Sequence, residues 1–153
     1  MLDDTIKDYM DRSVLCWLAT QNKGQPSVSP KEIFTYYGDH NIIIANIASQ
    51  HSVQNINACN NVCVSFIDIF AQKGFQTYGK AKILSSTQAD DNFEEKHAIL
   101  QKLAGDNFKV LSVIDLIVEK IKPILAPSYR INSDMDESQM IENGLKTYGV
   151  RRI

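Results

Sequence analysis

Four polar residues in the middle of the chain have the composition of an anion-binding helix start. They follow an apolar, β-branched run at residues 42–44 and read Ser49, Gln50, His51 and Ser52. Serine is a preferred N-cap residue, and the first turn of a helix has backbone N–H groups without intrahelical partners. The helix dipole also favours negative charge there. This spacing predicts a phosphate site where a strand passes into a helix. The alternative is that Ser49 serves only as a helix cap.

A second polar group lies on the strand expected from residue 26. Alternation places Ser27, Ser29 and Lys31 on one face of that strand. Pro30 has no N–H to donate to a neighbouring strand, so this strand is expected at a sheet edge or to be irregular there. Such a strand suits a flat ligand that meets backbone groups. The alternative is a solvated face with an exposed lysine.

The elements that must position these residues are mostly strands. Apolar runs and period-two patterns predict strands at residues 13–20, 26–34, 42–46, 62–67 and 75–84. Residues 109–125 fit both the helical and the strand period, and their Val and Ile content favours a strand that Pro123 and Pro127 end. Helical spacing and capping signals predict helices at residues 3–10, 50–59, 86–104 and 136–148, with Gly105 and Gly149 as stops. Many strands in a short chain favour closure into a barrel. We therefore expect a mainly β fold, a six-stranded barrel with peripheral helices, in one domain over residues 1–153.

Composition excludes several classes of protein. The formal net charge of −2 over 153 residues offers no electrostatic basis for nucleic-acid binding. No apolar run is long enough to span a membrane, and the first residues lack the features of a signal peptide. Three cysteines, an odd number, indicate a cytoplasmic protein without a disulfide framework. The Cys59–Cys63 spacing does not match a metal site, and no constellation identifies a catalytic residue.

Several short segments together resemble a known family. They are residues 18–20, 24–31, 45–55, 62–66 and 73–81, in order within residues 13–84. On these segments the sequence resembles the FMN-binding split-barrel proteins related to pyridoxamine 5′-phosphate oxidase. The resemblance implies a homodimer of six-stranded split barrels, with FMN bound in two clefts at the subunit interface.

The resemblance also implies a role for each matching residue. Ser29, Pro30 and Lys31 would line the isoalloxazine edge, and Ala45 and Asn46 would lie beneath the ring and ribityl chain. Ser49, Gln50, His51 and Ser52 would meet the phosphate, and Lys73 and Gln76 would approach from a neighbouring strand. Lys31 or Lys73 would stabilise the anionic reduced ring.

Two departures from the family pattern affect these expectations. Many relatives have Arg or Lys directly after the serine at the helix start, where this chain has Gln50 and His51. The phosphate charge must then be met by Lys31, Lys73, His51 or a partner chain. The ending at residues 148–153 also lacks the arginine- and proline-containing segment of the authentic oxidases. Pyridoxamine phosphate oxidation itself is therefore not expected.

The expected function is that of an FMN-dependent oxidoreductase acting on a small molecule. One alternative is a non-catalytic protein that binds or sequesters flavin. Another is a split-barrel relative that uses haem or a deazaflavin, for which His97 or His40 would be the haem candidate. Both histidines also fit ordinary helix and turn positions.

Overall fold

The computed structural model describes residues 1–132 and 134–151. These residues form a seven-stranded antiparallel sheet in the order β2-β1-β5-β6-β7-β4-β3. The strands are β1 (Cys16–Asn22), β2 (Gln25–Lys31), β3 (Phe34–Tyr37), β4 (Asn41–Asn46), β5 (Asn61–Asp68), β6 (Lys73–Leu84) and β7 (Ser112–Leu125). The helices are α1 (Asp4–Asp11), α2 (Gln50–Ala58), α3 (Phe93–Ala104), α4 (Ser128–Ile131) and α5 (Glu137–Tyr148). No described helix is both long and apolar enough to cross a membrane.

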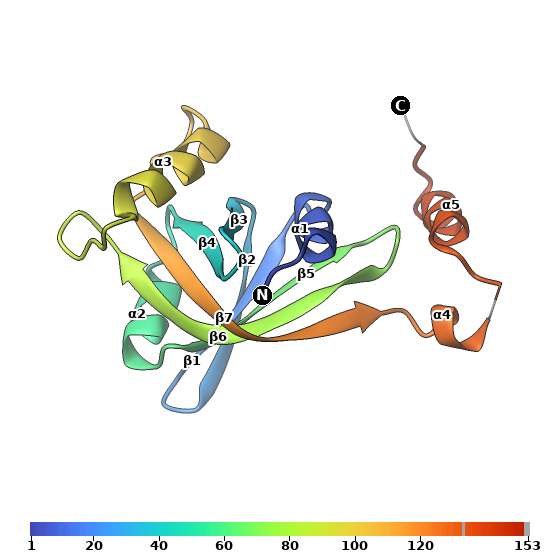
Figure 1. Ribbon diagram of the computed structural model, residues 1–153, viewed down its shortest axis with the longest axis horizontal. Helices are drawn as coiled ribbons and strands as arrows, with labels where there is room; N and C mark the ends of the chain where they lie inside the picture. The colour runs from blue at the N-terminus through green and yellow to red at the C-terminus, as the bar shows by residue number, and fades with distance from the viewer. Residues whose placement is uncertain (133, 152–153) are drawn as a thin grey trace.

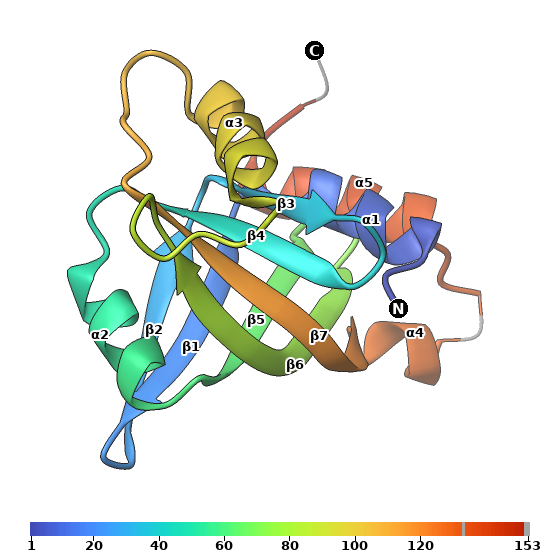
Figure 2. The same ribbon diagram turned by 60° about the vertical axis from the view of Figure 1, so that its left-hand side comes forward.

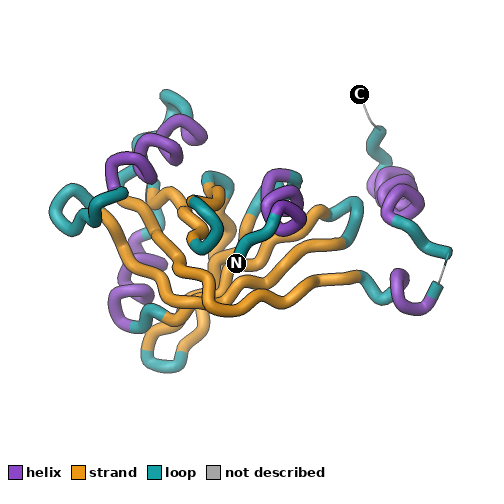
Figure 3. The backbone as a smooth tube through the Cα atoms, viewed as in Figure 1, coloured by secondary structure: helices purple, strands orange, loops and turns teal. Residues whose placement is uncertain are grey.

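The sheet curls around a main apolar core, to which α1 contributes Ile6, Tyr9 and Met10, and a second core lies beneath α3. In Figure 1 the long strands β6 and β7 run along the sheet, with α2 and α3 near one end. Figure 2 draws α5 behind α1, and Glu137 at the start of α5 contacts Tyr9 and Arg12 at the end of α1. Figure 3 shows the same curled sheet with helices around its periphery. The predicted fold class, a mainly β split barrel with peripheral helices, is confirmed.

Strand β4 is apolar at successive positions because both of its faces are buried. Ile42 and Ile44 face the barrel core, which also contains Leu18, Val64, Phe66, Ile114 and Leu116. Ile43 and Ala45 face a second core beneath α3, with Leu84, Phe93, Leu100 and Val113. A strand covered on both faces is apolar throughout rather than alternating. The run therefore holds the strand end at Asn46 rigidly between two packed layers.

Three sequence expectations about the strands and α3 need correction. The strand expected at residues 26–34 is split by a bend at Glu32 and Ile33, which creates β3 as a seventh strand. Helix α3 begins at Phe93 rather than near Ser86 or Thr87. Ahead of the helix, Asp90 accepts from the Asn92 N–H and pairs with Lys82 of β6 and with Lys96 in the first turn of α3, so this segment is held in a turn. Pro123 lies within β7 because β4 pairs only with its first half, so β7 pairs on one side there.

The C-terminal helix begins and ends as its sequence predicts. Asp136 forms a capping box with Gln139, and Gly149 ends the helix in the left-handed conformation. Met140 is buried on the inner face of the helix, whereas Tyr148 in its last turn is 59% exposed. The short helix α4 was not predicted. Of the chain ending discussed above, residues 152–153 lie outside the described residues.

Candidate functional site

The end of β2 places a lysine beside the start of α2. Lys31 is the last residue of β2, and its side chain is only 7% exposed. Its Nζ donates to Ser29 Oγ at 2.8 Å and to Ser49 Oγ at 2.5 Å. Ser29 and Lys31 share a strand face, as the alternation predicted, and β2 is an edge strand, as Pro30 predicted. The ammonium group therefore lies at the strand–helix junction.

The charge of Lys31 is not neutralised within the part of the chain described. No described carboxylate lies within ion-pair distance of Nζ, and both hydrogen-bond partners are neutral hydroxyls. Burial lowers the pKa of Lys31 below its usual value of 10.5. A buried cation without a counter-ion is unfavourable, so an anion bound here would stabilise it.

The start of α2 is also open to an anion. Ser49 occupies the N-cap position, as predicted, but its side chain makes no capping hydrogen bond and contacts Lys31 instead. The Ser49 N–H donates to Asn46 Oδ1 at 2.9 Å. Asn46 Nδ2 in turn donates to Ser112 Oγ at 2.9 Å, so this amide is held by the protein on both sides. Asn46 fixes the junction, while no described side chain caps the first turn of α2.

A pocket of about 270 Å³ opens beside this junction. Its lining residues are Pro30, Lys31, Glu32, Ile33, Ala45, Ile47, Ala48, Ser49 and Phe108. Pro30, Lys31, Ala45 and Ser49 belong to the predicted set, and their convergence joins β2, β4 and α2. The sequence reading missed Phe108, although a lone aromatic residue in the polar segment 105–109 was a signal that could have identified it.

The remaining predicted residues of α2 flank the pocket without lining it. Gln50 and His51 are exposed on the first turn. Ser52 is 4% exposed, so its side chain is enclosed by protein rather than presented to a ligand. The first turn can therefore offer backbone N–H groups more readily than the Ser52 hydroxyl.

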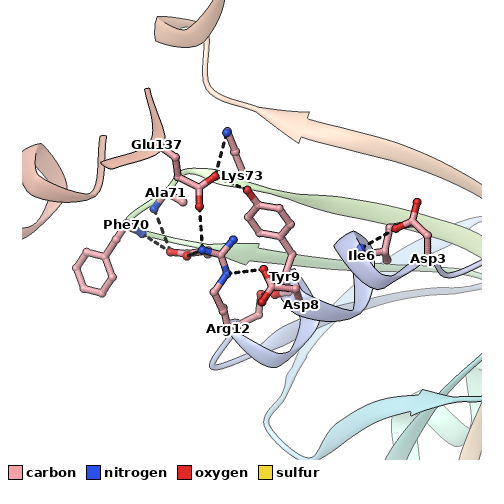
Figure 4. Close-up of polar contacts among 11 residues, drawn as sticks. Asp3, Ile6, Asp8, Tyr9, Arg12, Phe70, Ala71, Lys73 and Glu137 are labelled. Atoms are coloured by element: carbon pink, nitrogen blue, oxygen red, sulfur yellow. Dashed lines mark hydrogen bonds and ion pairs between the residues drawn. The ribbon is translucent and has the colours of Figure 1, made fainter. Parts of the chain in front are cut away.

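The structure does not bring Lys73 and Gln76 to this pocket within one chain. Lys73 opens β6, whereas the opposite end, Leu84, pairs with Val113 beside the pocket end of the sheet. A strand of 12 residues spans roughly 35 Å. Lys73 Nζ contacts Glu137 Oε2 at 3.0 Å, as Figure 4 shows. Gln76 accepts a hydrogen bond from the Tyr78 hydroxyl at 3.0 Å.

The histidines proposed for haem lie outside the pocket lining. His97 Nε2 is 2.9 Å from the Val110 carbonyl oxygen, so the ring is engaged with the backbone. His40 is exposed in a turn before β4. Neither position favours haem ligation at the Lys31 junction.

A larger open hollow of about 430 Å³ lies on the β1–β5–β6 part of the sheet. Its lining includes Thr20, Cys63 and Tyr78, and its sole charged lining residue within the described chain is Glu119. A lone carboxylate and no cation make it a poor site for an anion. The smaller pocket at Lys31 is the better candidate.

Comparisons with known proteins agree with this fold. The family described as pyridoxamine 5′-phosphate oxidase matches residues 2–123. The structure is similar to Group A Streptococcus HupZ (24% identity, TM-score 0.67, 79% of this chain and 92% of that chain). It is also similar to an FMN-binding protein from Syntrophomonas wolfei (15% identity, TM-score 0.65, 82% of this chain and 87% of that chain). A third similar structure is an F420 reductase (16% identity, TM-score 0.59, 78% of this chain and 98% of that chain). The comparison with curated proteins finds no match.

Proposed function

Because the chain belongs to the pyridoxamine 5′-phosphate oxidase-like family of split-barrel proteins, we propose that the Lys31 pocket binds FMN. The protein would then be an FMN-dependent oxidoreductase acting on a small molecule. The observation that carries the proposal is Lys31, a buried cation without a described counter-ion that points at the uncapped start of α2. An FMN-binding relative with the same fold supports the choice of cofactor.

The residues at the junction fit a phosphate. Lys31 Nζ supplies the charge, and the Ser49 hydroxyl and the first-turn N–H groups of α2 supply donors. In this chain the cation is provided by the end of β2 rather than by the first turn of α2. Of the two roles expected for Lys31, its contact with Ser49 favours the phosphate over the ring.

The rest of the pocket suits the flat part of the cofactor. Pro30, Ile33, Ala45, Ile47 and Phe108 give it apolar walls. When bound, FMN would supply the hydride and electron chemistry, while the chain binds and orients it and excludes water. Lys31 and Glu32 are the charged lining residues in the described chain. Neither is assigned a catalytic role.

The size of the pocket supports a site shared between two copies. About 270 Å³ falls short of the roughly 300–1,000 Å³ of typical small-molecule sites. A second chain would complete the walls and could bring Lys73 and Gln76, which lie far away in the same chain. The proposed assembly is therefore a homodimer with FMN at its interface.

Ser49→Asp tests the phosphate site. Aspartate suits an N-cap position and the helix dipole, and its carboxylate would neutralise Lys31. We expect unchanged or higher thermal stability. The affinity for FMN should fall at least ten-fold, to the level of the affinity for riboflavin, which lacks the phosphate. The measurements are thermal unfolding and calorimetric titration with both flavins.

Gln54→Asp is the matched control for Ser49→Asp. It makes the same charge change at an exposed position later in α2 and should leave FMN affinity unchanged. FMN binding by Ser49→Asp equal to wild type would overturn the phosphate assignment. Turnover with a reduced nicotinamide donor and an electron acceptor separates an oxidoreductase from a protein that only sequesters flavin.

A further inference from the structure

The connection between α3 and β7 carries an aromatic side chain into the wall of the pocket. This connection, residues 105–111, descends beside the β4–α2 junction in Figure 2. The Leu111 N–H donates to the Asn46 carbonyl oxygen at 2.8 Å, which fixes its lower end to the strand below the pocket. Phe108 lines the pocket, yet it is 53% exposed in the isolated chain. About half of this residue is therefore free to contact a ligand.

One side chain holds this connection in place. Gln101 Nε2 donates to the carbonyl oxygens of Gly105 at 3.0 Å and Phe108 at 2.8 Å. Gln101 Oε1 accepts from the Val110 N–H at 3.0 Å. The whole amide of Gln101 is thus used on the backbone around Phe108. His97 adds a further contact to the Val110 carbonyl oxygen.

We propose that Phe108 is a ligand-contacting residue that selects for a planar aromatic ring, and that Gln101 is its positioning residue. The proposal rests on the proposed function of the pocket and names its second recognition element. Lys31 and Ser49 recognise the anionic end, whereas Phe108 recognises the ring. Stacking of an aromatic side chain on a heterocycle depends on the planarity and position of the ring and needs no specific hydrogen bonds.

The Phe108 role is tested by binding of two flavins to Phe108→Ala. Because riboflavin has the ring but lacks the phosphate, loss of a ring contact should weaken both flavins equally, by about ten-fold, or about 1.4 kcal/mol. Ser49→Asp should instead weaken FMN alone. Phe108→Tyr keeps the ring and should bind as wild type does. Leu103→Ala, which removes an exposed apolar side chain from α3, is the control.

The Gln101 role is tested by Gln101→Glu, alone and combined with Phe108→Ala. The glutamate keeps an oxygen that accepts from the Val110 N–H. Its second oxygen replaces the NH2 group and would repel the carbonyl oxygens of Gly105 and Phe108. We expect a loss similar to that of Phe108→Ala, and a double variant no weaker than Phe108→Ala alone. Additive losses, or wild-type affinity for Gln101→Glu, would overturn the positioning role.

The two proposals fail in different ways. If wild-type protein binds neither FMN nor riboflavin, the proposed function fails. If wild-type protein binds FMN and Phe108→Ala binds both flavins with unchanged affinity, the ring contact is wrong and the phosphate site stands. Because Phe108 is about half exposed, Phe108→Ala should unfold at the same temperature as wild type. Thermal unfolding of each variant checks that a loss of affinity is not a loss of fold.

Discussion

At the scale of single residues, two lysines illustrate opposite ways of burying a charge. Lys96 is 3% exposed and lies 2.9 Å from Asp115, which is fully buried, and 3.2 Å from Asp90. These carboxylates raise its pKa despite burial, so this pair clamps α3 to the sheet. Lys31 is similarly buried but faces hydroxyls alone, and its pKa is lowered. The first arrangement is complete, whereas the second favours an added anion.

The lowered pKa of Lys31 makes a prediction about pH. Bound phosphate stabilises the protonated lysine, so FMN affinity should fall with rising pH as Lys31 loses its proton below pH 10.5. Titrations from pH 7.5 to 10 should show this fall in wild-type protein. Lys31→Met should bind FMN about 10–100-fold more weakly, since a charged hydrogen bond contributes about 1.5–3 kcal/mol.

Lys31→Met should also lose the pH dependence and retain full stability. The lowered pKa means that the charged form of Lys31 is less stable in the folded protein without ligand than in the unfolded chain. Removing this charge therefore removes an unfavourable contribution to the free energy of folding. A variant that binds FMN as wild type does, with the same alkaline fall, would contradict the assignment of Lys31.

At the scale of elements, a charged cluster fastens α5 to the rest of the protein (Figure 4). Glu137 accepts from the Tyr9 hydroxyl at 2.6 Å and pairs with Arg12 at 2.9 Å and Lys73 at 3.0 Å. The Tyr9 hydrogen bond is the largest cause that lowers the pKa of Glu137 to about 2. Residues of α1 and β6 thus hold the first turn of α5.

This cluster predicts that α5 loosens in acid. The stabilisation by Glu137 is complete above its usual pKa of 4.5 and is lost as the pH falls toward 2. Hydrogen exchange of the α5 amides should therefore accelerate across that window. Glu137→Gln should weaken α5 at neutral pH by about 1 kcal/mol and remove the acid dependence. Glu142→Gln, exposed on the same helix, is the control.

At the scale of the whole molecule, the pocket continues into an exposed apolar strip. Trp17 is 45% exposed and pairs in register with Pro30, which lines the pocket. Val28, on the same strand as Pro30, is 60% exposed. A second copy seated on β1 and β2 would cover this strip and close the pocket at the same time.

A shared site predicts that cofactor binding depends on dimerisation. Dilution should lower FMN affinity together with dimer content, measured by titration and sedimentation velocity. Trp17→Glu should weaken both, whereas Ile131→Glu, at an 83% exposed position, should affect neither. A monomer that binds FMN as tightly as the dimer would show that one chain suffices.

The sequence by itself determined most of the elements and four of the nine residues that line the pocket. The apolar run at residues 42–44, the proline in β2 and the glycines after α3 and α5 act locally, so spacing sufficed to predict them. The tertiary structure decided that Lys31 meets Ser49, that Lys73 is paired with Glu137, and that Phe108 joins the pocket wall. These contacts join residues from separate elements, and their distances depend on how the sheet curls, which no local pattern encodes.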